Sequence, residues 1–530
     1  MSLIYKIATE PSEFEQIVAM NYRTFVEEIP QHNENERRIL IDKFHEENTY
    51  IICLKDEKLI GMICVRSNRP FSLDGKIGRV EDHLPVSVQN PCEIRLLSVD
   101  PNYRNGRVFL GLAQALIRYC LKIGYDAAVI SGTTRQLKLY GQLGFQPFAY
   151  MTGNEEAAFQ PMYLTKATFD EGVAGRILNE PVNFLPGPVT ISNEVREAFM
   201  KSPISHRSVE FESILERVQA RLTKLTNSRY VQVLHGTGTL ANDVIAAQLS
   251  LLNGKGLILV NGEFGKRLVD HVQRMGLDFD TLETDWGNSF KKEEITTSLS
   301  AAPYEWVWAV HCETSTGIKN DIELLKELCQ ERNIHLCLDC ISSLGAIHID
   351  LDGVAFASGV SGKALASYTG LSFVFHNAPI ASDKRIPRYL DIGAYMEAEG
   401  IPYSQSSNLV NALEKALERY DDANKVYGEI EARYELLRSG IEDAGLSVLA
   451  SNEDAAPTIL TVEMPSGFVA RNLGDDLSLN GFNLHYESSY LQEKNWLQIS
   501  CINHIDDRQI KKMLKVLKGI CTIKQLSIHS

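Results

Sequence analysis

The sequence predicts an α/β protein with more than one domain, and three observations support this fold class. The chain has 530 residues, more than one hydrophobic core usually supports, so two or three domains are expected. In its second part, continuous apolar segments alternate with helical ones, as in a mostly parallel sheet covered by helices on both faces. In its first part, apolar strands flank one long helix, as in a smaller α/β domain.

A loss of hydrophobic periodicity in FDEGVAGRILNEP marks a linker, and the next segment opens with two prolines around a glycine. From Asn408 the sequence predicts one long amphipathic helix that leads into a terminal part with short strands. The expected divisions are residues 1–170 for the first α/β domain, 171–182 for the linker, 183–407 for the large domain and 408–530 for a small α+β domain.

The strands and helices follow from runs of apolar residues. In the first part, strands are expected at 50–55, 59–66, 92–100 and 127–132, and helices at 108–124 and 135–144. In the second part, strands are expected at 230–236, 256–262, 305–313, 335–340 and 354–360, with helical crossovers between them. No repeat or low-complexity tract interrupts this order.

Composition excludes several function classes. The chain is 44% apolar and 23% charged with a net charge of −15, which disfavours a broad nucleic-acid or acidic-membrane surface. No eighteen apolar residues run together and the first residues do not resemble a signal peptide, so we expect a cytoplasmic protein without a membrane span. The spacing of Cys337 and Cys340 in an apolar strand favours buried structural thiols, and no metal site is expected.

Four short segments at the carboxyl ends of predicted strands supply what pyridoxal phosphate requires. The loop 236–239 precedes a helix and offers N–H groups and hydroxyls for a phosphate, although such a loop alone is weak evidence. Asp339 ends an apolar strand, where a carboxylate needs a partner such as a protonated pyridine nitrogen. Lys363 lies in a loop of small residues, as expected for a Schiff-base lysine, and HCETSTG adds Thr314 and Ser315.

Residues 183–518 resemble a class-V aminotransferase of fold type I, the group that contains alanine–glyoxylate, serine–pyruvate and 2-aminoethylphosphonate aminotransferases. The matching segments are LPGPV, SHRSVEF, HGTGT, NGEFGKR, HCETSTG, DCISSLG and SGKAL. The resemblance implies pyridoxal 5'-phosphate as cofactor, a small amine or amino acid and an oxo acid as substrates, and a homodimer with shared active sites.

The resemblance also implies a role for individual residues. Lys363 matches the lysine that binds the cofactor and moves the proton, and Asp339 the partner of the pyridine nitrogen. Other matches are Thr237, Gly238 and Thr239 in the phosphate loop, Phe264 and Ile341 on the two ring faces, Thr314 beside the ring oxygen, and Ser404, a hydroxyl supplied by the neighbouring subunit.

One position departs from the family. Relatives bind the substrate α-carboxylate with an Arg in the strand where this chain has Gln498, and a neutral amide cannot replace that charge. Another cation takes over, the substrate lacks an α-carboxylate, or the reaction has changed. His206 and Arg207 are the candidate substitute anion ligands, and a purely structural role for them is equally compatible with the sequence.

The first 165 residues or so resemble the GNAT acyltransferase fold, particularly its N-acyl amino acid synthase-like branch, in EIRLLSVDPNYRNGRVFLGLAQALIRYCLKIGYD and LKLYGQLGFQPF. The resemblance implies that Arg104 and Gly106 start a loop for the donor diphosphate, that Leu97 pairs with the pantetheine arm, and that Tyr140 is the general acid. The usual loop glycines are missing or displaced, so a domain that serves binding or oligomerisation remains an alternative.

The leading hypothesis is a bifunctional biosynthetic enzyme. A class-V aminotransferase would share its chain with an N-acyltransferase that uses acetyl-CoA, another acyl-CoA or an acyl carrier donor, which raises the local concentration of an intermediate. The alternative is a pyridoxal-phosphate lyase or desulfurase-like enzyme with a non-catalytic GNAT-like binding or regulatory domain. A desulfurase needs a mobile cysteine in an exposed loop, which the sequence does not show.

Overall fold

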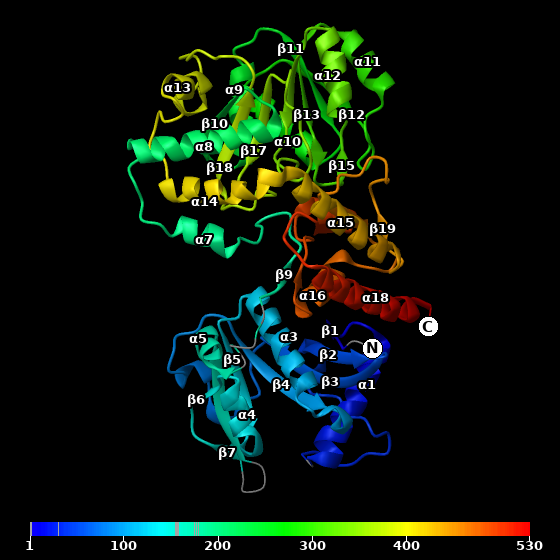
Figure 1. Cartoon of the computed structure of the whole chain (residues 1–530). Helices are drawn as coiled ribbons and strands as arrows, with labels where there is room; N and C mark the ends of the chain where they lie inside the picture. The colour runs from blue at the N-terminus through cyan, green and yellow to red at the C-terminus, as the bar shows by residue number, and fades with distance from the viewer. Residues whose placement is uncertain are drawn as a thin grey trace. The chain divides into compact units, whose positions relative to one another are not determined.

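Two compact units make up the computed structural model, which describes residues 3–29, 31–153, 158–173, 175, 178 and 180–529 (Figure 1). Unit 1 comprises Met1–Val182, Gly467–Asn483 and Lys511–Ser530, and unit 2 comprises Asn183–Ser466 and Leu484–Ile510. Both units combine helices with sheets, so the expected α/β fold class is confirmed. Parts of the expected small domain 408–530 therefore belong to unit 1. The expected linker 171–182 falls partly outside the described residues.

Unit 1 is built on an eight-stranded sheet. In spatial order its strands are β1 (Ile4–Ile7), β2 (Thr49–Lys55), β3 (Lys58–Arg66), β4 (Pro91–Val99), β5 (Ala127–Thr133), β8 (Ala158–Thr165) and β6 (Gln146–Pro147), and β7 (Thr152–Gly153) also pairs with β8. Helix α3 (Arg107–Ile123) packs on one face with Val108 and Leu112, and helix α1 (Pro11–Tyr22) packs on the other with Ile17.

Strands β4 and β5 are the one parallel pair among the described strands of this sheet, and they separate after a short contact. Their pairing runs from Pro91 opposite Ala127 to Glu93 opposite Val129 and then stops. Further along β4, Leu96 has a left-handed φ of 53°, and the register with β3 shifts at this point. This bulge bends β4 away from β5 and opens the sheet between them.

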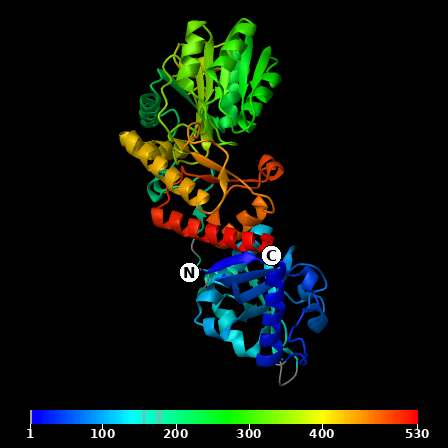
Figure 2. The same ribbon diagram turned by 90° about the vertical axis from the view of Figure 1, so that its right-hand side faces the viewer.

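Segments from the end of the chain complete unit 1. Helix α16 (Ala470–Leu479) covers the edge strand β1, where the Asp476 carboxylate accepts a hydrogen bond from the N–H of Ile7 at 2.9 Å. The Asn480 side chain accepts from the N–H of Tyr5 at 3.2 Å and donates to its carbonyl at 2.6 Å. Figure 2 shows the last helix, drawn in red, lying against the blue strand β1. These contacts satisfy an edge that would otherwise be open to pairing with other chains.

Unit 2 contains a seven-stranded sheet buried on both faces. In spatial order the strands are β10 (Tyr230–Gly236), β18 (Gly370–His376), β17 (Phe356–Val360), β16 (His335–Asp339), β13 (Tyr304–Val310), β11 (Lys255–Val260) and β12 (Phe279–Glu283). Six of these strands run in the same direction, and β18 runs in the opposite one.

Alternate residues of each central strand face different helix layers. Leu257 and Leu259 pack with α8 (Val209–Thr226) and α12 (Ile322–Glu331), whereas Ile258 and Val260 pack with α9 (Gly238–Leu249) and α10 (Glu263–Arg274). This arrangement explains the continuous apolar strands of the sequence.

The helix expected to run unbroken from Asn408 is interrupted. Helix α14 (Ser407–Leu417) ends in a 3₁₀ turn at Glu418–Asp422, and α15 (Ala423–Glu442) then begins with Asp422 as its cap. The Tyr420 hydroxyl in this turn lies 2.8 Å from the carbonyl of Gly345 and 2.7 Å from that of Ala364. A tertiary contact, which no helical periodicity encodes, therefore holds the break. Beyond α15, strands β19 (Ser447–Val448), β20 (Ile459–Glu463) and β22 (Trp496–Ser500) form a small sheet.

Among the described residues, no helix is both long and apolar enough to cross a bilayer. Nor does the described part of the chain bring three potential metal ligands together. All ten cysteines are buried and carry free thiols, including Cys337 and Cys340.

Candidate active sites

Two exposed threonines flank a buried glycine where β10 passes into α9. Thr237 is the residue before the helix and its hydroxyl makes no capping bond, and the side chains of Thr237 and Thr239 are both exposed. Gly238 lies between them, and a Cβ there would be only 2.5 Å from the Cδ1 of Ile341. The loop thus combines free hydroxyls, a helix N-terminus and a glycine required by close packing, which suits an anion.

Asp339 ends β16 as a buried carboxylate with few donors. Asn242 of α9 donates to its Oδ2 at 2.9 Å, and the N–H of Ile341 donates to its Oδ1 at 2.9 Å. Burial raises the pKa of Asp339 above its usual value. A cationic partner would therefore stabilise its ionised form.

Lys363 follows β17 at the same edge of the sheet. Its Nζ donates to the hydroxyl of Ser342 at 2.8 Å, and that hydroxyl also bonds the hydroxyl of Thr314. Burial lowers the pKa of Lys363, which favours the neutral, nucleophilic amine. The structure thus brings the predicted Lys363 and Thr314 together through Ser342, which the sequence analysis did not single out.

Phe264 lies in the first turn of α10. The centroid of its ring is 5.5 Å from the Nζ of Lys363. The turn is held by Glu313, whose buried carboxylate accepts from the N–H of Phe264 at 3.1 Å and of Gly265 at 3.0 Å. Burial raises the pKa of Glu313. Sequence reasoning missed Glu313, although its position beside Thr314 in HCETSTG was a usable signal.

Gln498 is completely buried in β22 and its amide is fully bonded. The Nε2 donates to the carbonyls of Thr314 at 2.7 Å and Ser315 at 3.1 Å and to the hydroxyl of Thr461 at 2.9 Å. Its Oε1 faces the Nδ1 of His485 at 3.0 Å and the hydroxyl of Tyr490 at 3.1 Å. The side chain therefore has no hydrogen-bonding group left for a substrate.

The remaining predicted residues of unit 2 lie at its surface. His206 is half-buried and Arg207 exposed, immediately before α8, and Ser404 is exposed between α13 (Ile392–Glu397) and α14. Within the described part of the chain, no hydrogen bond joins these side chains to Lys363 or Asp339. Their predicted roles remain predictions.

Unit 1 holds a cavity of about 1010 Å³ where β4 and β5 separate, lined by Leu97 and Tyr140 among others. Tyr140 lies on α4 (Leu137–Gln142) and packs on the ring of Phe145 at 6.2 Å between centroids. Burial raises the pKa of Tyr140, so its hydroxyl stays protonated at neutral pH and can donate a proton.

The loop before α3 is engaged by protein groups. Both terminal nitrogens of Arg104 bond the carboxylate of Glu28, one of them at 2.6 Å, and its Nε donates to the carbonyl of Val99 at 2.9 Å. Gly106 has the left-handed φ of 84° that glycine favours, and the Asn105 side chain accepts from the N–H of Arg107 at 3.1 Å. A diphosphate at this loop would have to displace Glu28.

Two families match the chain, one in each part. Residues 16–168 match N-acyl amino acid synthase FeeM, and residues 193–383 match aminotransferase class-V. The two resemblances predicted from the sequence are confirmed.

The similar proteins agree with the second match. A 2-aminoethylphosphonate–pyruvate transaminase of Pseudomonas aeruginosa is 29% identical over 64% of this chain and 95% of its own length. An alanine–glyoxylate aminotransferase from Nostoc sp. is 28% identical, with a TM-score of 0.60 over 64% of this chain and 95% of that one. A ureidoglycine–glyoxylate aminotransferase from Bacillus subtilis, at 20% identity, shares the fold with a TM-score of 0.60 over 66% of this chain and 94% of that one. The chain therefore combines a region of the N-acyl amino acid synthase FeeM family, residues 16–168, with a class-V aminotransferase domain, residues 193–383, whose family implies pyridoxal phosphate.

Proposed function

We propose that the chain is a bifunctional biosynthetic enzyme that moves an amino group in unit 2 and acylates an amine in unit 1. The amino transfer runs between a small amine or amino acid and an oxo acid. One arrangement carries this proposal: Lys363, Asp339 and the loop 237–239 meet at the carboxyl edge of one sheet, as Asn242 and Ile341 link the loop to Asp339.

The residues at this edge fit pyridoxal phosphate. Thr237, Gly238 and Thr239 would hold the phosphate, Asp339 the pyridine nitrogen, Ile341 and Phe264 the two ring faces, and Thr314 the ring oxygen. Within the described residues, the buried Oδ1 of Asn242 has no hydrogen-bond partner, so it is available to accept a hydrogen bond from a bound group. When bound, the cofactor withdraws electrons from the substrate α-carbon.

Lys363 would then move the substrate proton, and Asp339 would stabilise the positive charge of the pyridine nitrogen. Burial lowers the pKa of Lys363, which favours the neutral amine that would attack a carbonyl and later take a proton from the substrate carbon. The hydroxyl of Ser342 accepts a hydrogen bond from the Nζ of Lys363, and the hydroxyl of Thr314 bonds that of Ser342. Burial raises the pKa of Asp339, and a protonated pyridine nitrogen beside it would stabilise its ionised form.

The anionic group of the substrate must bind elsewhere than at Gln498, because the Gln498 amide is fully hydrogen-bonded to other protein groups. We propose His206 and Arg207 for this role, with Ser404 completing the phosphate site of the other subunit in a homodimer. The relatives named for 2-aminoethylphosphonate and pyruvate make an aminoalkylphosphonate or α-amino acid with an oxo acid the first pair to test.

In unit 1, the proposed reaction joins an amine nitrogen to the acyl carbon of a thioester. The carbon–sulfur bond breaks, Tyr140 gives its proton to the leaving thiolate, and the amine loses a proton to solvent. The cavity beside Leu97 would take the acyl donor, either acyl-CoA or an acyl carrier. The pairing of Arg104 with Glu28 favours a donor that does not depend on a tightly held diphosphate.

A desulfurase-like reaction is less well supported. Each of the ten cysteines is buried, and burial raises the pKa of Cys312, beside the site, to about 12. A thiolate nucleophile on a mobile loop is therefore missing among them. The free thiols also fit the cytoplasmic location that we propose.

The first test loads the full chain with pyridoxal phosphate and titrates it with α-amino acids, aminoalkylphosphonates and simple amines. Absorption spectra and chromatography of the released cofactor measure conversion to pyridoxamine phosphate. Conversion by one of these amines, and its reversal by an oxo acid, supports the aminotransferase proposal. A bound cofactor that no amine converts would exclude it.

A further inference from the structure

The cavity of unit 1 lies at the divergence of β4 and β5 and is lined by residues from both faces of the sheet. On the α3 side its wall is apolar and includes Leu116, Ile117 and Cys120. On the α1 side its wall includes the polar residues Ser72, Lys76 and Glu93, together with apolar residues such as Phe25 and Leu40. A ligand in this cavity therefore meets an apolar face at one end and charged groups at the other.

Two lysines that line the cavity, Lys43 and Lys76, form no ion pair within the described residues, and Lys76 is the one whose Nζ reaches β5. It lies on the short helix α2 (Asp74–Ile77), and its Nζ donates to the hydroxyl of Ser131 on β5 at 3.2 Å and lies 4.2 Å from the Phe159 ring centroid. Within the described residues it forms no ion pair, whereas Arg95 on the same wall pairs with Asp42 at 2.7 and 3.0 Å. Lys76 is thus free to bind an anion.

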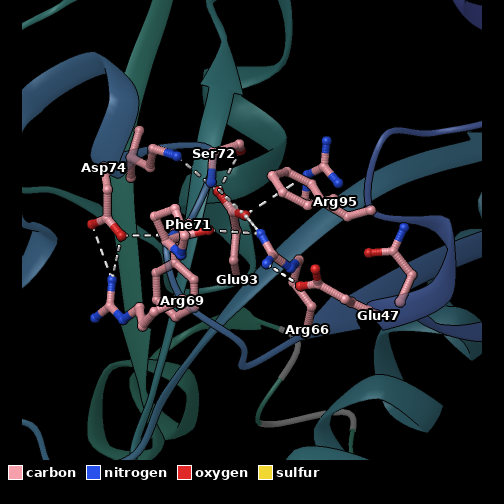
Figure 3. A network of polar contacts seen from close by, with 12 residues as sticks. Glu47, Arg66, Arg69, Phe71, Ser72, Asp74, Glu93 and Arg95 are labelled. Atoms are coloured by element: carbon pink, nitrogen blue, oxygen red, sulfur yellow. Dashed lines mark hydrogen bonds and ion pairs between the residues drawn. The ribbon is translucent and has the colours of Figure 1, made fainter.

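A buried polar network fixes the segment that carries Lys76 (Figure 3). The Glu93 carboxylate accepts from the N–H of Ser72 at 2.9 Å, from its hydroxyl at 2.5 Å and from the N–H of Leu73 at 3.0 Å. Arg66 and Arg95 lie 3.8 Å from the same carboxylate. Through these contacts Glu93 holds the Ser72–Leu73 segment against β4.

A second carboxylate in this network, Asp74, fixes the start of α2. It pairs with Arg69 at 2.7 Å and accepts from the N–H of Phe71 at 2.6 Å. Figure 3 shows Asp74 and Glu93 on either side of the Phe71–Ser72 segment. The backbone that carries Lys76 is therefore fixed, which lowers the entropic cost of binding a ligand.

Lys76 and Tyr140 contact neighbouring residues of β5 on opposite faces of the sheet. Lys76 bonds Ser131, and Gly132 lies against the Tyr140 ring, where a Cβ would be 3.2 Å from Cδ2. Neighbouring residues of a strand point to opposite faces, and here the sheet is open between β4 and β5. A small molecule across this opening could reach Lys76 with one end and the acyl carbon beside Tyr140 with the other.

We propose that Lys76 binds the carboxylate or phosphonate of the acyl acceptor and thereby selects amines that carry a negative group. This inference rests on the proposed acyl transfer in unit 1. Lys76 acts here as a specificity-determining residue, while the Glu93 and Asp74 network positions it.

The test measures acyl transfer by the full chain from acetyl-CoA and from a long-chain acyl thioester. The acceptors are α-amino acids, aminoalkylphosphonates and the primary amides of the same amino acids. Lys76→Met is expected to raise KM for anionic acceptors about 10- to 100-fold, the loss of one charge-assisted bond, with little change in kcat. Lys76→Arg should restore much of the affinity. Lys58→Met, at an exposed position on β3, is the matched control.

An unchanged preference for anionic acceptors in Lys76→Met would overturn the inference while leaving acyl transfer intact. If the unaltered chain acylates no amine, acyl transfer in unit 1 is refuted separately. Calorimetric titration with an N-acyl amino acid and its primary amide then tests Lys76 alone. Tighter binding of the acid, lost in Lys76→Met, supports the inference. Equal affinity for acid and amide, or no binding of either, overturns it.

Discussion

Replacing Gln498 by Leu tests whether this buried amide organises the active site or binds substrate. The substitution keeps a similar volume but removes a side chain that donates to Thr314, Ser315 and Thr461 and accepts from His485 and Tyr490. Because the position is fully buried, water cannot replace these partners. We therefore expect a large loss of stability in unit 2.

The amide has two N–H groups and two carbonyl lone pairs, so it makes the equivalent of four full hydrogen bonds to these five partners. At a net contribution of about 1 kcal/mol each, their loss costs about 4 kcal/mol. The more favourable burial of a leucine side chain offsets about 1 to 2 kcal/mol of this. The free energy of unfolding of unit 2 should therefore fall by about 2 to 3 kcal/mol. Since Thr314 is also released, cofactor affinity should fall with it.

Urea unfolding followed by tryptophan fluorescence is the assay. All four tryptophans, Trp286, Trp306, Trp308 and Trp496, lie in unit 2, so the signal reports this unit. Gln273→Leu, at an exposed position of α10, is the control and should change stability by less than about 0.5 kcal/mol.

A Gln498→Leu protein that loses less than about 1 kcal/mol would refute the reasoning. If that protein also showed a raised KM for carboxylate substrates with normal cofactor affinity, Gln498 would be a substrate ligand after all.

Three further predictions concern other parts of the chain. Lys363→Ala should fold normally but lose the visible absorption of covalently held cofactor, whereas Lys266→Ala should keep it; absorption that survives in Lys363→Ala would contradict the assignment. Burial raises the pKa of Asp476 to about 7, above the usual value of about 4, so unit 1 should lose stability as pH rises between these values. Asp476→Asn, which still accepts from Ile7, should remove this loss, so the variant is more stable at pH 8 by at most about 4 kcal/mol and equal near pH 4, as measured by hydrogen exchange of β1; a pH-independent difference would contradict the buried acid. Tyr140→Phe should lower kcat of acyl transfer about 100-fold with little change in KM, and an unchanged kcat would exclude its role as general acid.

The sequence by itself determined the fold class and singled out the residues that we propose for the cofactor. Continuous apolar strands between amphipathic helices predicted the parallel sheet of unit 2, because a strand buried on both faces carries no polar alternation. Asp339 and Lys363 could be singled out because each interrupts an apolar or small-residue segment at a strand end. Their meeting at one sheet edge then follows from the parallel order of β16 and β17.

Other features depend on which distant residues meet, and no local pattern records that. Periodicity placed residues 408–530 in one small domain, whereas α16 caps the edge of β1 through Asp476 and Asn480. Gln498 was noticed as a missing charge, but only its buried partners reveal an amide with no capacity left. Lys76 looks like an ordinary surface lysine in the sequence, and only the structure shows that it lines the cavity of unit 1 with its Nζ on Ser131. Local sequence sets secondary structure through periodicity, whereas hydrogen-bond partners and burial arise from contacts between segments hundreds of residues apart.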